Sequence, residues 1–423
     1  MNYDFSTLGA LLGLAAAIIL IIKKVQPAYS LILGALIGGI IGSGGDLVTT
    51  VSAMVSGGET MISSVLRIMT SGILAGVLIK TGSAEKIAEV IVEKLGAKRA
   101  LISVALATMI ICAVGVFIDI SVITVAPIAL SIGQRAGYSK ASLLLAMIGG
   151  GKAGNIISPN PNTIAVAEAF NLNLTSLMMK NAVPAVCALI VAVILASFLA
   201  KRTKMKVSSV SEKLSDATEN RELPSFLQAI AGPAVVIILL GLRSAASIEI
   251  DPLIALPAGG IVCALACGHI KFIREYAEFG LEKVIGVSVL LIGTGTIAGI
   301  IQTSALQYDV IRILEAANMP VFLLAPCAGI LMAGAAASTT AGATIASQTF
   351  AGILTEAGVP ALSAGAMVHA GATVIDSLPH GSFFHATGGA AGMTINERMK
   401  LIPFEACVGL TSTIVSVILY IVF

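Results

Sequence analysis

The chain has 423 residues, of which 57% are hydrophobic and 11% are charged, whereas charged residues make up about 25% of an ordinary soluble domain. The 25 lysines and arginines nearly balance the 23 aspartates and glutamates, so the chain lacks the strongly basic surface that nucleic-acid binding requires. This composition excludes a cytosolic enzyme, a disordered protein and a nucleic-acid-binding protein. It predicts an all-α polytopic membrane protein whose first partner is the lipid bilayer.

Ten apolar stretches are long enough to cross, or nearly cross, a hydrocarbon core of about 30 Å. They lie at residues 5–22, 28–43, 62–80, 141–170, 178–200, 227–243, 252–268, 284–302, 360–395 and 403–423. Two further apolar blocks, 100–133 and 320–355, carry a polar cluster in mid-run, which indicates hairpins that enter and leave the membrane on one side. Most lysines and arginines fall in loops on one side of this topology, so the positive-inside rule predicts that both termini lie outside the cell.

An amphipathic stretch precedes each of these two hairpins, at residues 84–95 and 305–317. In the first, Ile87, Val90 and Ile91 share one face of a helix and the glutamates lie elsewhere. Such a helix lies at the membrane interface or is a simple surface helix, and the pattern is compatible with both.

The second half of the sequence repeats the first at an offset of about 220 residues, so that Gly150 corresponds to Gly371 and Pro159 to Pro379. Each half contains five crossings, an odd number, so the second copy is expected to be inverted in the membrane. Inverted repeats are typical of secondary transporters. We predict a first repeat at residues 1–200, a polar cytoplasmic linker at 201–224 and a second repeat at 225–423.

Polar residues inside apolar spans are costly unless they line a cavity, so they are candidates for function. At the predicted tip of the first hairpin lie Asp119, Ser121 and Thr124, and at that of the second lie Ser338, Thr339 and Thr340. The hydroxyl groups can either cap a helix or bind a ligand, and both readings stay open. Asp119 is the only acidic residue between Glu93 and Glu168, and a carboxylate at mid-membrane depth is suited to carrying a proton.

Proline and glycine interrupt one span in each half, at 141–170 and 360–395. Broken spans at corresponding places in two halves indicate a transporter binding site, because freed backbone N–H groups there can face an anion. The candidate binding residues are Lys152, Asn155, Ser158, Asn160, Asn162 and Thr163 in the first break and Ser377, His380 and Ser382 in the second. Asp376 is a second candidate for proton coupling. Lys152 has two possible partners, a substrate carboxylate or an internal one from Asp119 or Asp376.

The sequence contains no Walker-type phosphate loop and no cluster of metal ligands at zincin-like spacing. We therefore expect no cofactor and no metal, and a coupling ion that is either H⁺ or Na⁺. The alternative to a transporter is an intramembrane enzyme that uses Asp376 and His380. The sequence offers no further acidic or histidine ligand at zincin-like spacing beside these two residues.

Three segments resemble the gluconate permease family of proton symporters, within the ion transporter superfamily. They are VFIDISVITVAPIALSIGQRAGYS, GGGKAGNIISPNPNTIAVAEAF and SLPHGSFF. The resemblance implies uptake of a small hydroxylated carboxylate, such as gluconate, a related sugar acid, a short hydroxy acid or D-serine, across a bacterial inner membrane. It also implies a homodimeric elevator-type carrier, in which hairpins and broken helices move together against a scaffold.

The chain departs from the family pattern in two places. Asn160 stands between two prolines where a histidine is expected, and the hairpin acid is Asp119 rather than a glutamate. These departures leave a shorter hydroxy acid or an amino-acid-like substrate open beside gluconate.

Overall fold

The structure is a computed structural model, and it describes residues 4–96, 99–202, 222–246, 248, 250–306, 308, 309, 312, 316, 320–379 and 381–423. These residues form α-helices joined by short turns, and no β-strand occurs among them. The all-α fold class is therefore confirmed. The predicted linker at 201–224 lies almost entirely outside the described residues, as does most of the amphipathic stretch at 305–317.

The helices of the first half are α1 (Thr7–Ile22), α2 (Pro27–Gly42), α3 (Leu47–Glu59), α4 (Ile62–Lys80), α5 (Ser83–Leu95), α6 (Ala100–Ala113), α7 (Ile118–Ala136), α8 (Lys140–Asn155), α9 (Pro161–Ala169), α10 (Leu174–Lys180) and α11 (Ala182–Arg202). Those of the second half are α13 (Phe226–Ala246), α14 (Pro252–Ala266), α15 (Ile273–Gln302), α17 (Leu324–Ala336), α18 (Thr339–Glu356), α19 (Ala361–Gly371), α20 (Ser382–Ala390), α21 (Ile395–Met399) and α22 (Ile402–Val422).

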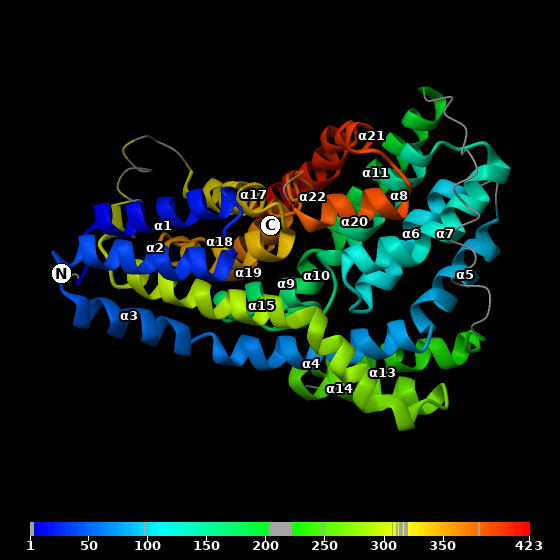
Figure 1. Ribbon diagram of the computed structural model, residues 1–423, viewed down its shortest axis with the longest axis horizontal. Coiled ribbons are helices and arrows are strands. Elements are labelled where there is room, and N and C mark those ends of the chain that lie inside the picture. Colours follow the sequence, from blue (N-terminus) through cyan, green and yellow to red (C-terminus); the bar gives the residue numbers. More distant parts are fainter. Residues whose placement is uncertain are drawn as a thin grey trace.

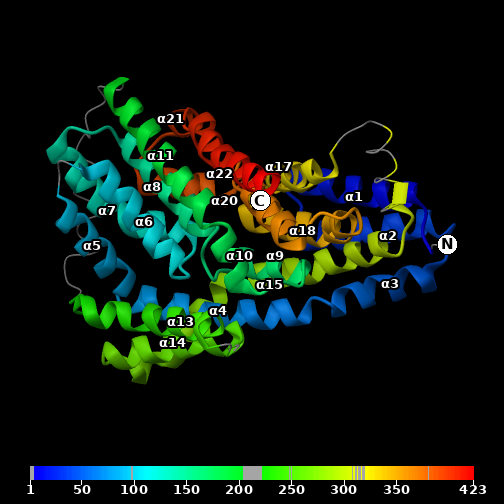
Figure 2. The ribbon, with the colours of Figure 1, turned by 180° about the vertical axis from the view of Figure 1, so that it is seen from behind.

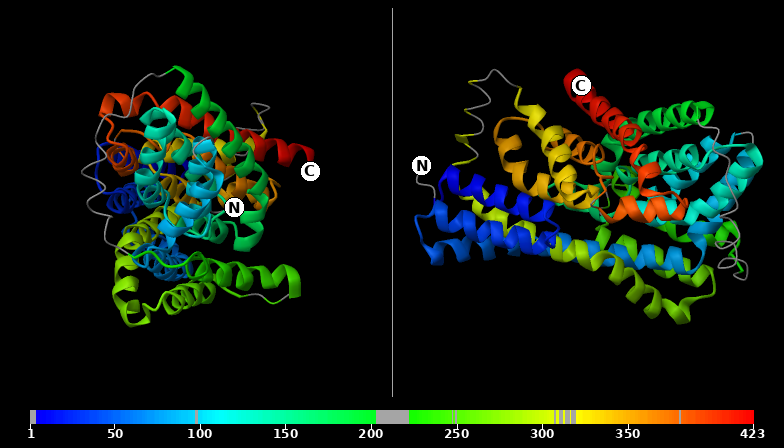
Figure 3. Two further views of the ribbon diagram at one scale, coloured as in Figure 1. Left: turned by 90° about the vertical axis from the view of Figure 1, so that its right-hand side faces the viewer. Right: turned by 45° about the horizontal axis from the view of Figure 1, so that its top comes forward.

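The longest helical segments lie along one side of the molecule. Helices α3 and α4 follow each other end to end, and α15 packs along both (Figure 1). Glycines allow this close approach, because a Cβ atom at Gly76 would lie 2.2 Å from the carbonyl oxygen of Tyr276 and one at Gly57 would lie 2.2 Å from that of Gly295. The hairpins and broken helices lie together on one face of these long helices, above them in the view of Figure 1, and Figures 2 and 3 show the same arrangement.

Helix α3 was not among the predicted spans. Its serines, threonines and glycines lower the hydropathy of the stretch, so it is not a strongly apolar run. The helix begins after Asp46, whose side chain caps the first turn by accepting hydrogen bonds from the amides of Val48 and Thr49. The predicted helix at 84–95 is confirmed as α5, but its buried face differs from the predicted one. Ile87, Ala88 and Val92 are buried, whereas Val90 and Ile91 are only half-buried.

The two halves run through the same order of elements. Each has a pair of packed helices, a long helical segment, a two-helix hairpin, a broken helix, a short helix and a final long helix. The hairpins are α6–α7 and α17–α18, and the broken helices are α8–α9 and α19–α20. Gly150 lies against Ala105 of the first hairpin, and Gly371 lies against Pro326 of the second. The two glycines are 221 residues apart in the sequence, and so are the two residues that they contact.

Among the described residues, four helical segments are long and apolar enough to cross a membrane, judged by length and composition, namely Leu47–Lys80, Ala182–Lys201, Ile270–Gln302 and Ile395–Val422. Shorter apolar helices include α1, α2, α6 and α14. The number of crossings and the orientation of the termini stay predictions.

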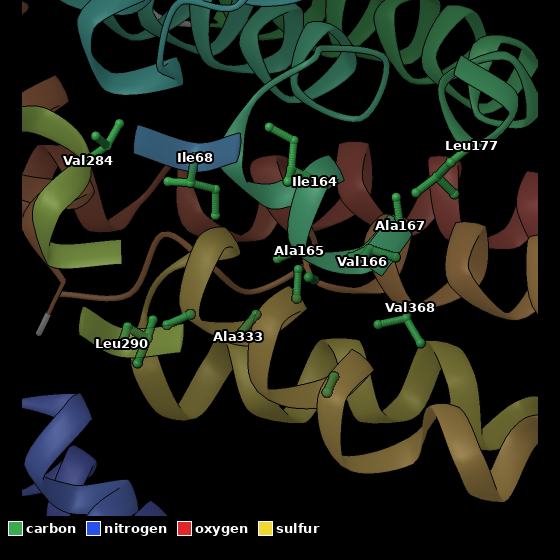
Figure 4. Close-up of a cluster of buried hydrophobic side chains, with 14 of the residues drawn as sticks. Ile68, Ile164, Ala165, Val166, Ala167, Leu177, Val284, Leu290, Ala333 and Val368 are labelled. Carbon is green, nitrogen blue, oxygen red and sulfur yellow. The ribbon is translucent and has the colours of Figure 1, made fainter. Parts of the chain in front are cut away.

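The apolar core joins the long helices to the helices that carry the predicted site. Figure 4 shows Ile68 of α4 and Leu290 of α15 in one cluster with Ile164 of α9, Ala333 of α17 and Val368 of α19. All five side chains are buried. In this conformation the hairpins and breaks therefore pack directly against α4 and α15.

Candidate functional site

The first break is shorter than the sequence suggests. Helix α8 runs through the glycine-rich stretch to Asn155, and α9 begins at Pro161. The glycines were expected to loosen this span, and that expectation is wrong. They serve close packing instead, because a Cβ atom at Gly150 would lie 2.0 Å from the carbonyl oxygen of Ala105, and one at Gly154 would lie 2.3 Å from that of Met109.

Three asparagines form the hydrogen-bonded centre of this break. Asn160 Nδ2 donates to Asn155 Oδ1 at 2.6 Å, and Asn162 Nδ2 donates to the same oxygen at 2.9 Å. Asn160 Oδ1 caps α9 by accepting from the backbone amides of Asn162 and Thr163 at 3.0 and 3.1 Å. Asn155 Nδ2 is buried and has no hydrogen-bond partner among the described residues, so one donor stays available to a ligand.

The second break is organised around Asp376, between the end of α19 at Gly371 and the start of α20 at Ser382. Lys152 Nζ lies 2.5 Å from Asp376 Oδ1, and the Lys152 ammonium also donates to the carbonyl oxygen of Thr373. Thr339 Oγ1 donates to Asp376 Oδ2 at 2.5 Å. The side chains of Lys152 and Asp376 are 2% and 3% exposed, so this ion pair joins the two breaks in the interior.

A cavity of about 420 Å³ opens where both hairpins and both breaks meet. The predicted site residues that line it are Asp119, Asn155, Asn160, Asn162, Ser338, Thr339, Thr340, Asp376 and Ser382. Residues from the starts of four helices, α7, α9, α18 and α20, contribute to its wall. Because helix N-termini carry a partial positive charge and free N–H groups, this arrangement favours an anion.

Ser338 both caps a helix and lines the cavity. Its Oγ atom accepts a hydrogen bond from the amide of Ala341 at the start of α18. Capping and ligand binding by this hydroxyl are therefore compatible. Asp119 also lines the cavity and lies in the first turn of α7, which has no side-chain cap among the described residues.

Three other predicted residues lie outside the described cavity wall, and two of them bind residues of that wall. Ser158 Oγ donates to the carbonyl oxygen of Cys112 at 2.6 Å, Thr163 Oγ1 donates to Asn160 Oδ1 at 3.2 Å, and Ser377 Oγ donates to Asp376 Oδ1 at 3.0 Å.

Ser121 and Thr124 were expected at the hairpin tip, but both lie inside α7, because the turn ends at Phe117. Ser121 Oγ donates to the carbonyl oxygen of Phe117 at 2.9 Å. His380 lies outside the described residues.

Among the described residues, two polar side chains of the cavity wall are not predicted from the sequence, namely Gln26, which caps α2, and Lys283 within α15. Lys283 was counted among the loop charges because the apolar run of its span starts at residue 284. The structure extends α15 back to Ile273, which places Lys283 on a helix that faces the cavity.

A second cavity, also of about 420 Å³, lies beside Arg67 of α4. Arg67 Nη2 lies 2.6 Å from Asp251 Oδ2, and Arg67 Nη1 binds Glu168 at the end of α9. The Arg67 guanidinium holds the pKa of the Asp251 carboxyl below its usual range through these hydrogen bonds. This cluster ties the far end of the first broken helix to α4.

The fold and the site define a polytopic membrane transporter, and comparison with known proteins agrees. A family model described as GntP family permease matches residues 5–258. The chain is 53% identical over 418 residues, 99% of each protein, to an "Uncharacterized transporter" of Haemophilus influenzae (strain ATCC 51907 / DSM 11121 / KW20 / Rd). It is 22% identical over 306 residues, 67% of each protein, to the "High-affinity gluconate transporter" of Escherichia coli (strain K12).

The fold is also similar to a crystal structure of the YdaH transporter of Alcanivorax borkumensis, with a TM-score of 0.59 and 14% identity, covering 88% of this chain and 87% of that one. The chain belongs to the GntP family of permeases. It is a multi-pass membrane transporter and not an enzyme, as predicted.

Proposed function

We propose that this permease is a proton-coupled symporter that carries a small hydroxylated carboxylate into a bacterial cell across the inner membrane. The observation that carries this proposal is the cavity where four helix N-termini meet, lined by amides, hydroxyls and the Asp119 carboxyl. The N-termini suit the carboxylate of the substrate, and the side-chain amides suit its hydroxyl groups. The similarity to a protein named as a gluconate transporter supports the same substrate class.

The free hydrogen-bonding capacity of the first break supports binding of a polar molecule. Asn155 Nδ2 is buried beside the cavity without a partner among the described residues. A substrate hydroxyl or carboxylate oxygen would satisfy this donor. Asn162 and Thr340 line the same cavity, and we assign them to the substrate hydroxyls.

Asp119 is our choice for the proton carrier. Asp376 is neutralised by Lys152 at 2.5 Å, so a change in its protonation would leave a buried lysine unpaired. Asp119 lines the cavity and forms no ion pair within 4.0 Å among the described residues, so its charge can change during the transport cycle at lower cost.

The repeated order of elements supports two inverted halves and an elevator mechanism. In this proposal α4 and α15 belong to the scaffold, and the hairpins and broken helices form the moving body. The shared register of Gly150 with Ala105 and of Gly371 with Pro326 supports the internal repeat. A homodimer is part of the same proposal.

The test is uptake by purified protein in liposomes. A labelled panel of gluconate, glycerate, 3-hydroxybutyrate and D-serine is offered under an inward proton gradient, with and without sodium. Uptake that follows the proton gradient without sodium supports the proposal. Uptake that requires sodium would favour the alternative, in which the asparagine and hydroxyl oxygens bind Na⁺, and no uptake of any of the four would overturn the substrate class.

The Asp119→Asn variant tests the proton carrier. We expect it to lose accumulation driven by the proton gradient while keeping exchange of labelled for unlabelled substrate, because exchange needs no net proton movement. Wild-type accumulation by this variant would contradict the assignment of Asp119.

A further inference from the structure

An anionic substrate is best held by a full positive charge in addition to helix N-termini, and Lys152 is not available for this role. Its ammonium group lies 2.5 Å from Asp376 Oδ1 and also donates to the carbonyl oxygen of Thr373. Its side chain is 2% exposed and lies outside the described cavity wall. Lys152, in the last turn of α8, therefore neutralises an internal carboxylate.

Lys283 is the only lysine or arginine in the described wall of the cavity. It comes from α15, whereas most of the polar wall comes from the hairpins and breaks. Its Nζ atom lies 5.0 Å from the ring centroid of Phe279, one turn earlier on the same helix, which orients the side chain without neutralising it. Among the described residues, no carboxylate lies within 4.0 Å of this ammonium.

While Asp119 is ionised, its charge balances that of Lys283, so the cavity needs an anion for charge balance only once Asp119 carries the proton. The Lys152 and Asp376 charges cancel each other, and Asp119 becomes neutral when it carries the proton. Lys283 then leaves the cavity with one uncompensated positive charge, in a wall that already presents four helix N-termini. A monoanionic carboxylate satisfies both features, whereas a neutral polyol satisfies neither.

We propose that Lys283 binds the carboxylate of the substrate and thereby selects the acid over its neutral analogues. This inference rests on the proposed function, since it assigns a residue to the charged end of the proposed substrate. Lys283 acts by direct contact with that carboxylate, while the asparagines of the first break bind the hydroxyl end.

The experiment compares an acid with its primary amide. Wild-type protein in liposomes is first offered labelled gluconate, glycerate and 3-hydroxybutyrate. For an acid that accumulates, uptake of the labelled acid is then measured in the presence of the unlabelled acid or of its unlabelled primary amide. The same competition is measured for Lys283→Gln, for Lys283→Arg, which keeps the charge, and for Lys80→Gln. Lys80 is the matched control because its Nζ atom also lies over the Phe279 ring, at 4.7 Å, but it does not line the cavity.

We expect Lys283→Gln to weaken binding of the acid by about 10- to 100-fold, the range for losing a hydrogen bond to a charged group, with little change for the amide. Lys283→Arg should keep the preference for the acid, and Lys80→Gln should behave as wild type. An unchanged preference in Lys283→Gln would overturn this inference alone. If wild-type protein takes up none of the acids, the proposed function fails first and this inference fails with it.

Discussion

The two broken helices occupy matching places in the two halves but are held together differently. In the first break the polar groups bind one another, since Asn160 and Asn162 both donate to Asn155 a few residues away. In the second break Asp376 is bound by Lys152 from the first half and by Thr339 from a hairpin. The asparagine cluster of the first break is thus a local structure, although Ser158 of this break also binds Cys112 of the hairpin. The contacts of Asp376 in the second break form only once distant segments have packed together.

The largest expected effect is that of Asp376→Asn, which leaves Lys152 buried without its carboxylate. Removing one partner of a buried ion pair costs about 3–5 kcal/mol, so we expect a large loss of folded protein. Thermal stability in detergent, followed by size-exclusion chromatography, measures it. The double variant Lys152→Met/Asp376→Leu removes both charges and should recover stability. If Asp376→Asn alone has the melting temperature of the wild type, the second break does not depend on this ion pair.

A matched pair of glycines tests whether the two halves pack alike. Gly150→Ala and Gly371→Ala would place a Cβ atom 2.0 Å and 2.5 Å from a carbonyl oxygen, and overpacking of this kind costs about 1–3 kcal/mol. We expect both to lower the melting temperature, Gly150→Ala more strongly. Gly241→Ala is the control, because no atom lies within 4 Å of its added Cβ, and it should not destabilise; equal melting of all three variants would contradict the packing argument.

Asn160→Ala tests the local character of the first break. The variant removes the cap of α9, which costs about 1 kcal/mol, and it also removes the bond to Asn155. We expect a moderate fall in melting temperature and weaker binding of the substrate. Asn160→Ser keeps an oxygen that can cap α9, so it should recover stability but not binding; recovery of both would mean that only the cap matters.

The smallest effect is expected at the ion pair between Arg67 and Glu168, which ties α9 to α4. Glu168 contacts Arg67, but its side chain is 27% exposed, and a partly exposed pair contributes about 0–1 kcal/mol. Glu168→Gln should therefore change the melting temperature far less than Asp376→Asn. A comparable loss would mean that the first break also depends on a distant charge.

Much of the fold could be predicted from the sequence because the signals are local. The apolar runs, the proline-rich breaks and the hairpin blocks mark where helices begin and end, and nine predicted site residues line one cavity. Helix α3 was missed because its hydroxyl residues and glycines mask its apolar face. The glycines of α8 were misread, since whether a glycine loosens a helix or admits a neighbour depends on that neighbour, here Ala105.

The sequence by itself determined the all-α class and picked out nine polar residues that line one cavity, because hydropathy and helix breaking act over a few residues. Only the tertiary structure decided the partners of the charges. Lys152 and Asp376 are 224 positions apart along the chain, and no periodicity or spacing selects this pair over Lys152 with Asp119. It also decided that Lys283 faces the cavity, because the direction of a helix face is fixed by what packs on its other sides.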